Sequence, residues 1–282
     1  MSATKTELMP VLSGDEVRKT TGREATLRSA LASTNVRAVI IVLVIFGGGF
    51  WLWNLSTERG WVSPLLLAPP EAVGEALARM FSDGTIWTNL AATAQITILG
   101  LTIAIVLALL ISFLFVFSES LRKAVYPMLI IIQTFPKVAI APLIIAGFGY
   151  GTTPKVILAA LMAFFPILVN ALVGMTNING DQVNLFRSVG ASKWQVIRKL
   201  RIPNAISYLL PALNSAAVLA LIGTIVAEFV SAREGMGFAI QAAVQTGSVG
   251  TTFALLFVLG CFGVAIWLTM AALNFLLRKY QR

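Results

Sequence analysis

The chain has 282 residues, of which 57% are hydrophobic and 12% are charged, and its 21 Lys and Arg against 12 Asp and Glu give a net charge of +9. Soluble globular domains carry roughly a quarter of charged residues, so this composition excludes an ordinary soluble domain and predicts an integral membrane protein. The absence of histidine and the presence of one cysteine exclude histidine-based metal and catalytic sites and a disulfide scaffold.

The polar segment 1–35, rich in Ser, Thr and charged residues, is predicted to be a flexible cytoplasmic tail. The remainder, 36–282, is predicted to be one transmembrane domain with six apolar runs, each long enough to cross a bilayer core about 30 Å thick as an α-helix. The first run is too long and too deep in the chain for a secretory signal, so we expect a retained anchor. The predicted spans are Val36–Leu55, Asn89–Phe117, Tyr126–Phe148, Pro154–Met175, Tyr208–Phe229 and Thr252–Leu277.

The basic residues are distributed unevenly between the two sides of these spans. Sixteen of the 21 Lys and Arg residues lie in four segments: the amino-terminal tail with the start of the first span, the loop after the second span, the loop after the fourth span, and the carboxyl-terminal tail. Because bacterial membrane proteins retain Lys and Arg on the cytoplasmic side, both termini are predicted to be cytoplasmic. The basic residues are not interleaved with aromatic residues, so nucleic-acid binding is not predicted.

A short amphipathic helix is predicted between the first and second spans, over 69–84. The sequence PPEAVGEALARMFSDG has prolines at a helix start, acidic residues in the opening turns and Gly84 as a stop. Val73, Leu77 and Met80 share one face of such a helix. On the outer surface it either packs against the ends of the spans or serves as a plain connector.

A lysine lies within the third predicted span. Lys137 follows Pro136, and Pro127 and Pro142 also interrupt this segment. A charge inside a bilayer is costly, and interrupted helices of transporters can line a path. Two interpretations follow from the residues: Lys137 faces the path and helps to admit an anion, or it snorkels or pairs with a carboxylate for structural reasons.

The loop between the fourth and fifth spans predicts two short helices that meet at a glycine corner. Residues 181–189 fit a helix that Gly190 ends, because glycine adopts the left-handed conformation at no steric cost. Ser192 and Gln195 fit a capping box that opens a second helix, and Pro203 is predicted to end it. A plain connection between two spans would need far fewer residues.

Apolar side chains are expected on both of these short helices, at Phe186, Val189, Trp194 and Ile197. A rigid knob with an exposed aromatic residue is typical of a docking surface for another protein. The alternative is that these side chains pack back on the spans.

A second charged residue, Glu228, lies near the outer end of the fifth predicted span. We expect an outer-gate or interface residue rather than a substrate ligand. Lys137 and Glu228 are therefore the candidates for the pathway or its gate.

The loop resembles the signature of the permease subunits of bacterial ATP-binding-cassette importers. The resemblance lies in FRSVGASKWQVIRKLRIPNAISYLLPAL, Phe186 to Leu213. Gly190 matches the glycine of the family pattern, and Ile202-Pro203 falls where the family has Leu-Pro. Asn184-Leu185-Phe186 stands in place of the family's Glu-Ala-Ala, so no role of that acidic residue is carried over.

Four further segments are similar to the nitrate/taurine/sulfonate branch of these permeases, and together they cover most of the chain from about residue 60. They are SPLLLAPPEAV, FPKVAIAPLIIAGFGYG, FFPILVNALVGM and VAEFVSAREGMGFAI. The resemblance implies an all-α integral membrane protein of the bacterial inner membrane, with six transmembrane helices in the type I importer permease fold. It also implies a cytoplasmic coupling helix between the fourth and fifth spans.

The resemblance further implies an assembly of two copies of this chain, two cytoplasmic ATPase subunits and an extracytoplasmic substrate-binding protein. The chain has no Walker A pattern, so ATP and Mg²⁺ would be bound by the ATPase, and this chain is predicted to be a transporter subunit without a cofactor rather than an enzyme. The implied solutes are nitrate, bicarbonate, alkanesulfonates or small heteroaromatic compounds such as pyrimidine vitamin precursors. The implied ATPase-coupling residues are Leu185, Phe186, Gly190, Ala191, Ser192, Trp194 and Pro203.

Two other classes of function are weighed against this one. A self-sufficient secondary transporter or channel predicts paired charges within the membrane or inverted repeats, and the sequence shows neither convincingly. An intramembrane enzyme predicts a nucleophile with its base or a metal cluster, and the sequence shows no such set.

Overall fold

A computed structural model describes residues 38–231 and 233–277. The tail predicted at 1–35 lies outside these residues. Throughout the described ranges the regular secondary structure is helical, as predicted. The chain divides into two units, 1–63 and 64–282. In the first unit the structure describes one helix, Ala38–Glu58, which is long and apolar enough to cross a membrane.

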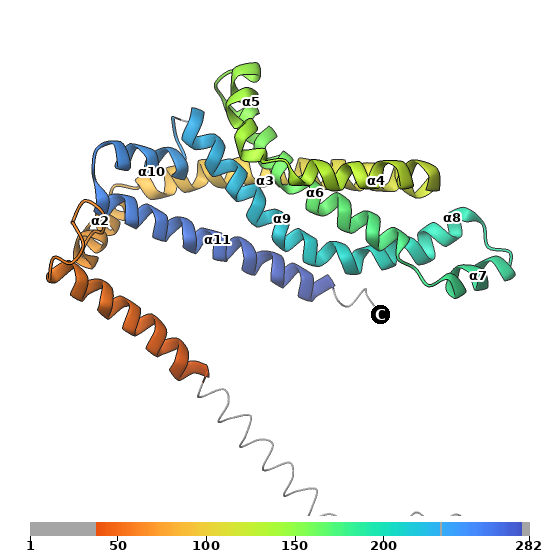
Figure 1. The fold of residues 1–282 in the computed structure, drawn as a ribbon, viewed down its shortest axis with the longest axis horizontal. Coiled ribbons are helices and arrows are strands. Elements are labelled where there is room, and N and C mark those ends of the chain that lie inside the picture. Colours follow the sequence, from red (N-terminus) through yellow and green to blue (C-terminus); the bar gives the residue numbers. More distant parts are fainter. Residues whose placement is uncertain (1–37, 232, 278–282) are drawn as a thin grey trace, which may run out of the picture. The chain divides into compact units, whose positions relative to one another are not determined.

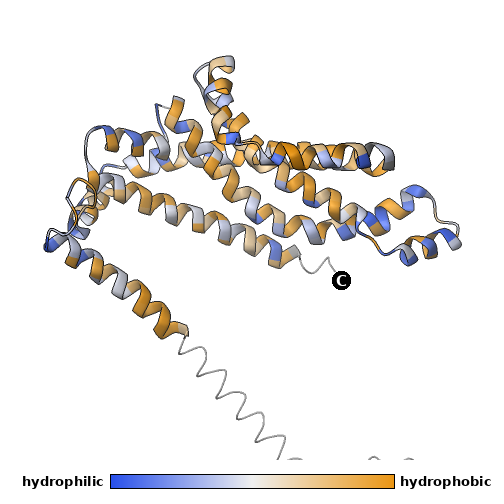
Figure 2. Ribbon diagram, in the orientation of Figure 1, coloured by the Kyte–Doolittle hydropathy of each residue, from blue (hydrophilic) through white to orange (hydrophobic). Residues whose placement is uncertain are grey.

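The second unit consists of helices joined by short turns (Figure 1). In chain order its described elements are α2 (Pro70–Ser82), α3 (Thr85–Phe117), α4 (Glu119–Thr134), the 3-10 turn η1 (Lys137–Ile140), α5 (Ala141–Phe148), α6 (Thr152–Thr176), α7 (Gly180–Ser188), α8 (Lys193–Val196), the π turn η2 (Ile197–Arg201), α9 (Ile202–Ser231), α10 (Met236–Gln245) and α11 (Val249–Leu277). Figure 2 shows apolar residues along the long helices and hydrophilic residues gathered at α7 and α8.

Four of the predicted spans correspond to long helices of this unit. They are α3, α6, α11 and the helix that contains α9, and each satisfies the length and hydropathy of a membrane span. The helix of α9 is longer than predicted, because α8, η2 and α9 run on as one helix of 39 residues, Lys193–Ser231.

The third predicted span is bent rather than straight. α4 ends at Thr134, and η1 and α5 continue after a bend of 78°. Pro136 lies at the break, where it has no N–H to donate and its ring would clash with the carbonyl group four residues earlier in an uninterrupted helix. The expected interruption is confirmed, and the described helices give six crossings if this pair counts as one.

The closest helix packing joins α3, α6 and α9 at positions occupied by glycine and alanine. A Cβ atom at Gly100 of α3 would lie 2.5 Å from the Cβ of Ala159 on α6, and one at Gly223 of α9 would lie 2.9 Å from the Cα of the same alanine. Near the carboxyl end of α6, a Cβ at Gly174 would lie 2.7 Å from the Cα of Ala205 on α9. Backbones can approach this closely only where side chains are small, which is how helices associate strongly in lipid.

The amphipathic helix predicted at 69–84 forms α2. Val73 is buried, and Leu77 and Met80 pack against a core cluster built from α3, α9, α10 and α11. A Cβ at Gly250 of α11 would lie 3.0 Å from the carbonyl oxygen of Ala72. The helix therefore packs against the spans, and the plain-connector interpretation is wrong.

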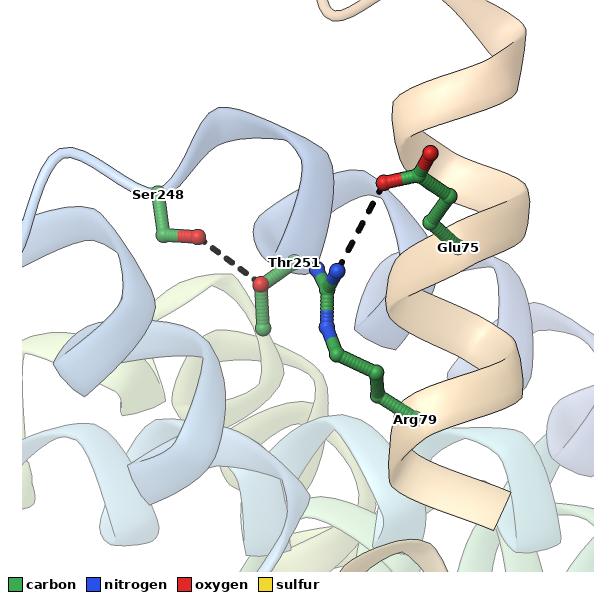
Figure 3. Close-up of polar contacts among 4 residues, drawn as sticks. All are labelled: Glu75, Arg79, Ser248 and Thr251. Atoms are coloured by element: carbon green, nitrogen blue, oxygen red, sulfur yellow. Dashed lines mark hydrogen bonds and ion pairs between the residues drawn. The ribbon is translucent and has the colours of Figure 1, made fainter. Parts of the chain in front are cut away.

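Polar pairs lie on the exposed sides of α2 and of the start of α11 (Figure 3). Arg79 and Glu75 form an ion pair at 3.6 Å, one helical turn apart, and the Ser248 hydroxyl donates to Thr251 Oγ1 at 2.8 Å. Exposed pairs of this kind contribute at most about 1 kcal/mol. The position of α2 thus depends on its apolar face.

The helix α10 was not predicted from the sequence. It has 10 residues, too few for a membrane span, and it lies between the fifth and sixth spans. Met236, Ile240 and Ala243 are buried against α9 and α11.

Replacing Gly223 by valine is expected to lower the free energy of unfolding by roughly 1–3 kcal/mol, because the new side chain forces α6 and α9 apart. Thermal unfolding in detergent measures this change. Gly260→Val is the matched control, since a Cβ built at Gly260 on α11 would meet no other helix within 4 Å. Equal melting temperatures for the two variants would contradict the packing account.

Candidate functional site

The two short helices predicted in the loop between the fourth and fifth spans form a knob, defined here as residues 180–201. It comprises α7, α8 and η2 and lies at the end of the bundle opposite α2 and α10 (Figure 1). No residue of α7 is buried. The first helix of the knob, α7, therefore projects from the described part of the chain.

The corner of the knob has the predicted glycine conformation. Gly190 has φ +72°, in the left-handed region. Its N–H donates to the carbonyl of Arg187 at 3.0 Å, and the N–H of Ala191 donates to the carbonyl of Phe186 at 2.9 Å. These two bonds satisfy carbonyl groups that the end of α7 would otherwise leave unpaired, the arrangement of a Schellman motif.

Each short helix of the knob begins with a side-chain cap. The Ser192 hydroxyl accepts the N–H of Gln195 at 3.3 Å, and the Gln195 side chain accepts the N–H of Ser192 at 2.7 Å, so the predicted capping box is confirmed. Asn179 caps α7 by accepting the N–H of Asp181 at 3.0 Å. Because both starts and the corner between them are fixed, the knob has a defined shape.

Pro203 does not end the second helix, and that prediction is wrong. The chain passes from α8 through η2 into α9 without a break, and the N–H of Ile202 donates to the carbonyl of Ile197, five residues earlier. This wider turn lies directly before Pro203. It accommodates a residue that lacks an N–H and whose ring disfavours the ordinary helical register.

The apolar side chains of the knob divide into two groups. Leu185, Val189 and Trp194 are 63%, 74% and 53% exposed, whereas Ile197 is buried. The exposed Trp194 contacts α3 at one edge, with its ring centroid 6.2 Å from that of Phe113. The base of the knob therefore packs on the spans, and its tip presents apolar surface; docking of another protein there stays a prediction.

The knob carries more exposed basic than acidic side chains, with Asp181 the acidic residue. Four basic side chains of the knob are exposed, those of Arg187, Lys193, Arg198 and Lys199. Figure 2 shows the corresponding hydrophilic colouring on α7 and α8. The tip thus combines apolar anchors with cations, which suits a partner surface that is apolar at its centre and acidic at its rim.

Polar side chains near the start of α9 fix the end of α6, and the sequence analysis missed them. Asn204 Nδ2 donates to the carbonyl of Gly174 at 2.6 Å, and an Arg201 guanidinium nitrogen donates to the carbonyl of Met175 at 3.2 Å. Asn177 Nδ2 donates to the Tyr208 hydroxyl at 2.8 Å. Arg201 and Asn204 are 26 and 30 positions after the carbonyl groups that they bind, so the sequence contained no local signal for these two bonds.

Lys137 lies at the bend between α4 and α5, away from the knob. Its side chain is half-buried, and the ammonium lies 4.9 Å from the centroid of the Phe165 ring of α6. Within 38–231 and 233–277 it makes no ion pair with a carboxylate. A cation over a ring face is a third arrangement, beyond the two that the sequence suggested.

Glu228 is completely buried within the chain. It accepts a hydrogen bond from the Thr93 hydroxyl of α3 and another from the N–H of Gly237 of α10. In this conformation it connects three helices and does not line an open path. In the described part of the chain, no group of three or more Cys, Asp and Glu residues gathers to hold a metal ion.

Comparisons with known proteins cover most of this chain. The family model described as "Binding-protein-dependent transport system inner membrane component" matches residues 100–282. The formylaminopyrimidine transport permease protein of Halalkalibacterium halodurans is 32% identical over 231 residues, 82% of this chain and 92% of the relative. The riboflavin transport system permease protein of Chloroflexus aurantiacus is 29% identical over 86% of this chain and 88% of its own. The taurine transport system permease protein of Escherichia coli is 30% identical over 68% and 71%.

Solved structures share the fold. An amino acid ABC transporter crystallised with histidines has a chain that superposes with a TM-score of 0.57 at 21% identity, covering 72% of this chain and 97% of its own. An inward-facing form of the MetNI methionine ABC transporter gives a TM-score of 0.53 at 19% identity, with 68% and 94% covered.

Replacing Gly190 by valine is expected to loosen the corner, because a β-branched residue in the left-handed region costs about 1–2 kcal/mol. Amides of the knob should then exchange with solvent roughly 5–30 times faster, as measured by hydrogen exchange. The control is Gly180→Val, at the start of α7, where φ is not positive and a built Cβ would meet no atom within 4 Å apart from those of its chain neighbours and its own helix backbone. Equal exchange in both variants would show that the corner does not depend on Gly190.

Proposed function

This chain belongs to the family of binding-protein-dependent transport system inner membrane components, and we propose that its knob is the surface on which an ATPase subunit docks to drive transport. The chain is a membrane-spanning permease subunit of an ATP-binding-cassette importer. One observation above all supports the docking proposal: a capped, rigid helix pair exposes apolar residues at the tip of a bundle that is otherwise built to lie in lipid.

The proposed docking residues are those of the corner and tip. Leu185 and Trp194 supply exposed apolar anchors, and apolar and aromatic anchors dominate the energetics of protein interfaces. Gly190, Ala191 and Ser192 fix the angle between α7 and α8. Phe186 and Pro203 lie at the base, where Phe186 is half-buried and Pro203 follows the π turn.

We propose that the knob faces the cytoplasm and that both termini lie on that side of the bacterial inner membrane. The exposed cations of the knob support this orientation, because basic loops are retained in the cytoplasm. An ATPase that works in the cytoplasm would meet the knob there. The end that carries α2 and α10 would then face an extracytoplasmic binding protein.

The proposed assembly contains two copies of this chain, two ATPase subunits and the binding protein. The chain has no Walker A pattern, so the ATPase subunits would bind ATP and Mg²⁺ and this chain would need no cofactor. Its own role is to form the path and to change its shape when the docked ATPase closes. A self-sufficient secondary transporter, by contrast, would need no separate ATPase subunit.

The proposed solute is a small heteroaromatic compound of the class named for the relatives from Halalkalibacterium and Chloroflexus. Their permeases are named for formylaminopyrimidine and riboflavin and are 32% and 29% identical over 82% and 86% of this chain. The taurine permease is 30% identical over 68%, and a permease named for aliphatic sulfonates, of Bacillus subtilis, is 26% identical over 93%. Lys137, at the bend of the third span, has its ammonium over the Phe165 ring. This arrangement gives no support to an anion site at that lysine.

Replacing Leu185 by aspartate is expected to weaken ATPase binding at least tenfold, because a charge would be buried without a partner in the docked interface. Binding of the purified ATPase to the permease in nanodiscs measures the loss. Leu185→Met keeps the apolar volume and should bind within about threefold of the natural chain.

The transport part of the proposal is tested in proteoliposomes that contain the natural permease, the ATPase and the binding protein. Uptake of formylaminopyrimidine should require ATP and the binding protein, and taurine should not compete with it. Uptake by the permease alone without ATP would contradict the importer assignment, and undiminished ATPase binding by the aspartate variant would contradict the docking surface.

A further inference from the structure

A polar ladder joins α3 and α9 in the half of the bundle away from the knob. The Thr93 hydroxyl donates to the Glu228 carboxylate, at 2.9 and 3.1 Å to its two oxygens, and the Thr97 hydroxyl donates to Thr224 Oγ1 at 3.0 Å. All four residues are buried. In each helix the two members are four residues apart, so the ladder runs along one face of α3 and one face of α9.

The start of α10 is attached to the end of this ladder. Three consecutive backbone N–H groups, 235–237, donate to side chains of other helices: the first to Asn89 Oδ1 at 2.9 Å, the second to Thr93 Oγ1 at 2.8 Å and the third to Glu228 Oε2 at 2.7 Å. The first N–H groups of a helix have no partner within it, and burying them unpaired is costly. These three side chains therefore determine where α10 begins.

Two glycines make this attachment sterically feasible. Gly235 has φ +112°, and a Cβ there would overlap the Glu228 carboxylate. A Cβ at Gly237 would lie 2.7 Å from the Cβ of Glu228. The spacing Glu-x6-Gly-x-Gly within VAEFVSAREGMGFAI is thus explained by the close approach of one carboxylate to a helix start.

The same carboxylate lies near the far end of the helix that carries the knob. Lys193–Ser231 has 39 residues and no break, which gives a length of about 58 Å at a rise of about 1.5 Å per residue. Its first turn is α8, beside the Gly190 corner, and its last turns carry Glu228. One continuous helix therefore connects the knob at one end with α10 at the other.

We propose that Glu228 is a positioning residue that makes α10 move with α9, so that a displacement of the knob reaches the opposite end of the path. This inference rests on the proposed function of the knob. Motion of α9 reaches α10 through the groups that join them: the Glu228 carboxylate bonds the start of α10 to α9, while Asn89 and Thr93 bond it to α3 and Thr93 also holds the carboxylate. Without these bonds the start of α10 keeps only its apolar packing against α9 and α11, and we expect α10 to lag behind a displacement of α9.

The test uses the complete importer in proteoliposomes and measures solute taken up per ATP hydrolysed, with formylaminopyrimidine as the probe. Thr93→Val is nearly isosteric but removes both the donor to Glu228 and the acceptor of the second N–H, whereas Thr93→Ser keeps them. The valine variant should lower the transport ratio at least tenfold while ATP hydrolysis continues, and the serine variant should stay within about twofold. Glu228→Leu and Glu228→Gln form a second pair with the same expectation.

A transport ratio that is unchanged in Thr93→Val and Glu228→Leu would overturn the inference, as would an equal loss in each variant and its conservative counterpart. A merely structural role would lower assembly without changing the ratio for the importer that does assemble. If neither disruptive variant assembles, hydrogen exchange of the natural importer decides: amides 235–237 should stay protected both with and without ATP. Rapid exchange in either state would overturn the inference. Absence of ATP-driven uptake by the natural chain would instead contradict the proposed function.

Discussion

The close contact of three backbones at Ala159 is the constraint on which the rest of the bundle depends. In lipid, apolar side chains gain little by leaving the solvent, so helices associate through close packing and hydrogen bonds. Gly100 and Gly223 let α3 and α9 approach the same turn of α6 from two sides. With these three helices in contact, α11 packs alongside α9, where Asn274 Nδ2 donates to Asn214 Oδ1 at 2.9 Å, and the knob and α10 lie at its two ends.

Several polar groups described inside this bundle are paired according to their chemistry, although the buried Asn274 Oδ1 has no hydrogen-bond partner among the described residues. The Glu228 carboxylate, which can only accept when ionised, receives a hydroxyl and a backbone N–H. The threonines of the ladder donate along and across their helices. Lys137 uses the face of an aromatic ring. A membrane interior without water makes such pairing necessary, and it also ties distant segments of the chain together.

Local signals made much of this structure predictable. The length of the apolar runs predicted the spans, and the prolines of α2 predicted where that helix begins. Gly190, Ser192 and Gln195 predicted the shape of the knob, because each hydrogen bond that fixes it joins residues at most five positions apart. The sequence did not reveal α10, because its start is held by side chains more than 130 residues away in the chain. Pro203 was misread because a π turn is a property of several successive hydrogen bonds and has no single-residue signature.

The wide turn at Ile197–Arg201 also constrains how this chain can change over evolutionary time. A π turn contains one residue more than the α-helical turn it replaces, and each residue of a helix corresponds to a rotation of about 100°. The wide turn accommodates this residue locally, so deleting it would restore ordinary pitch while the helix on either side keeps its direction. A change of one residue in length is therefore expected to be tolerated in this stretch, whereas the same change within the ordinary turns of α9 would rotate α7 and α8 by about 100° around its axis.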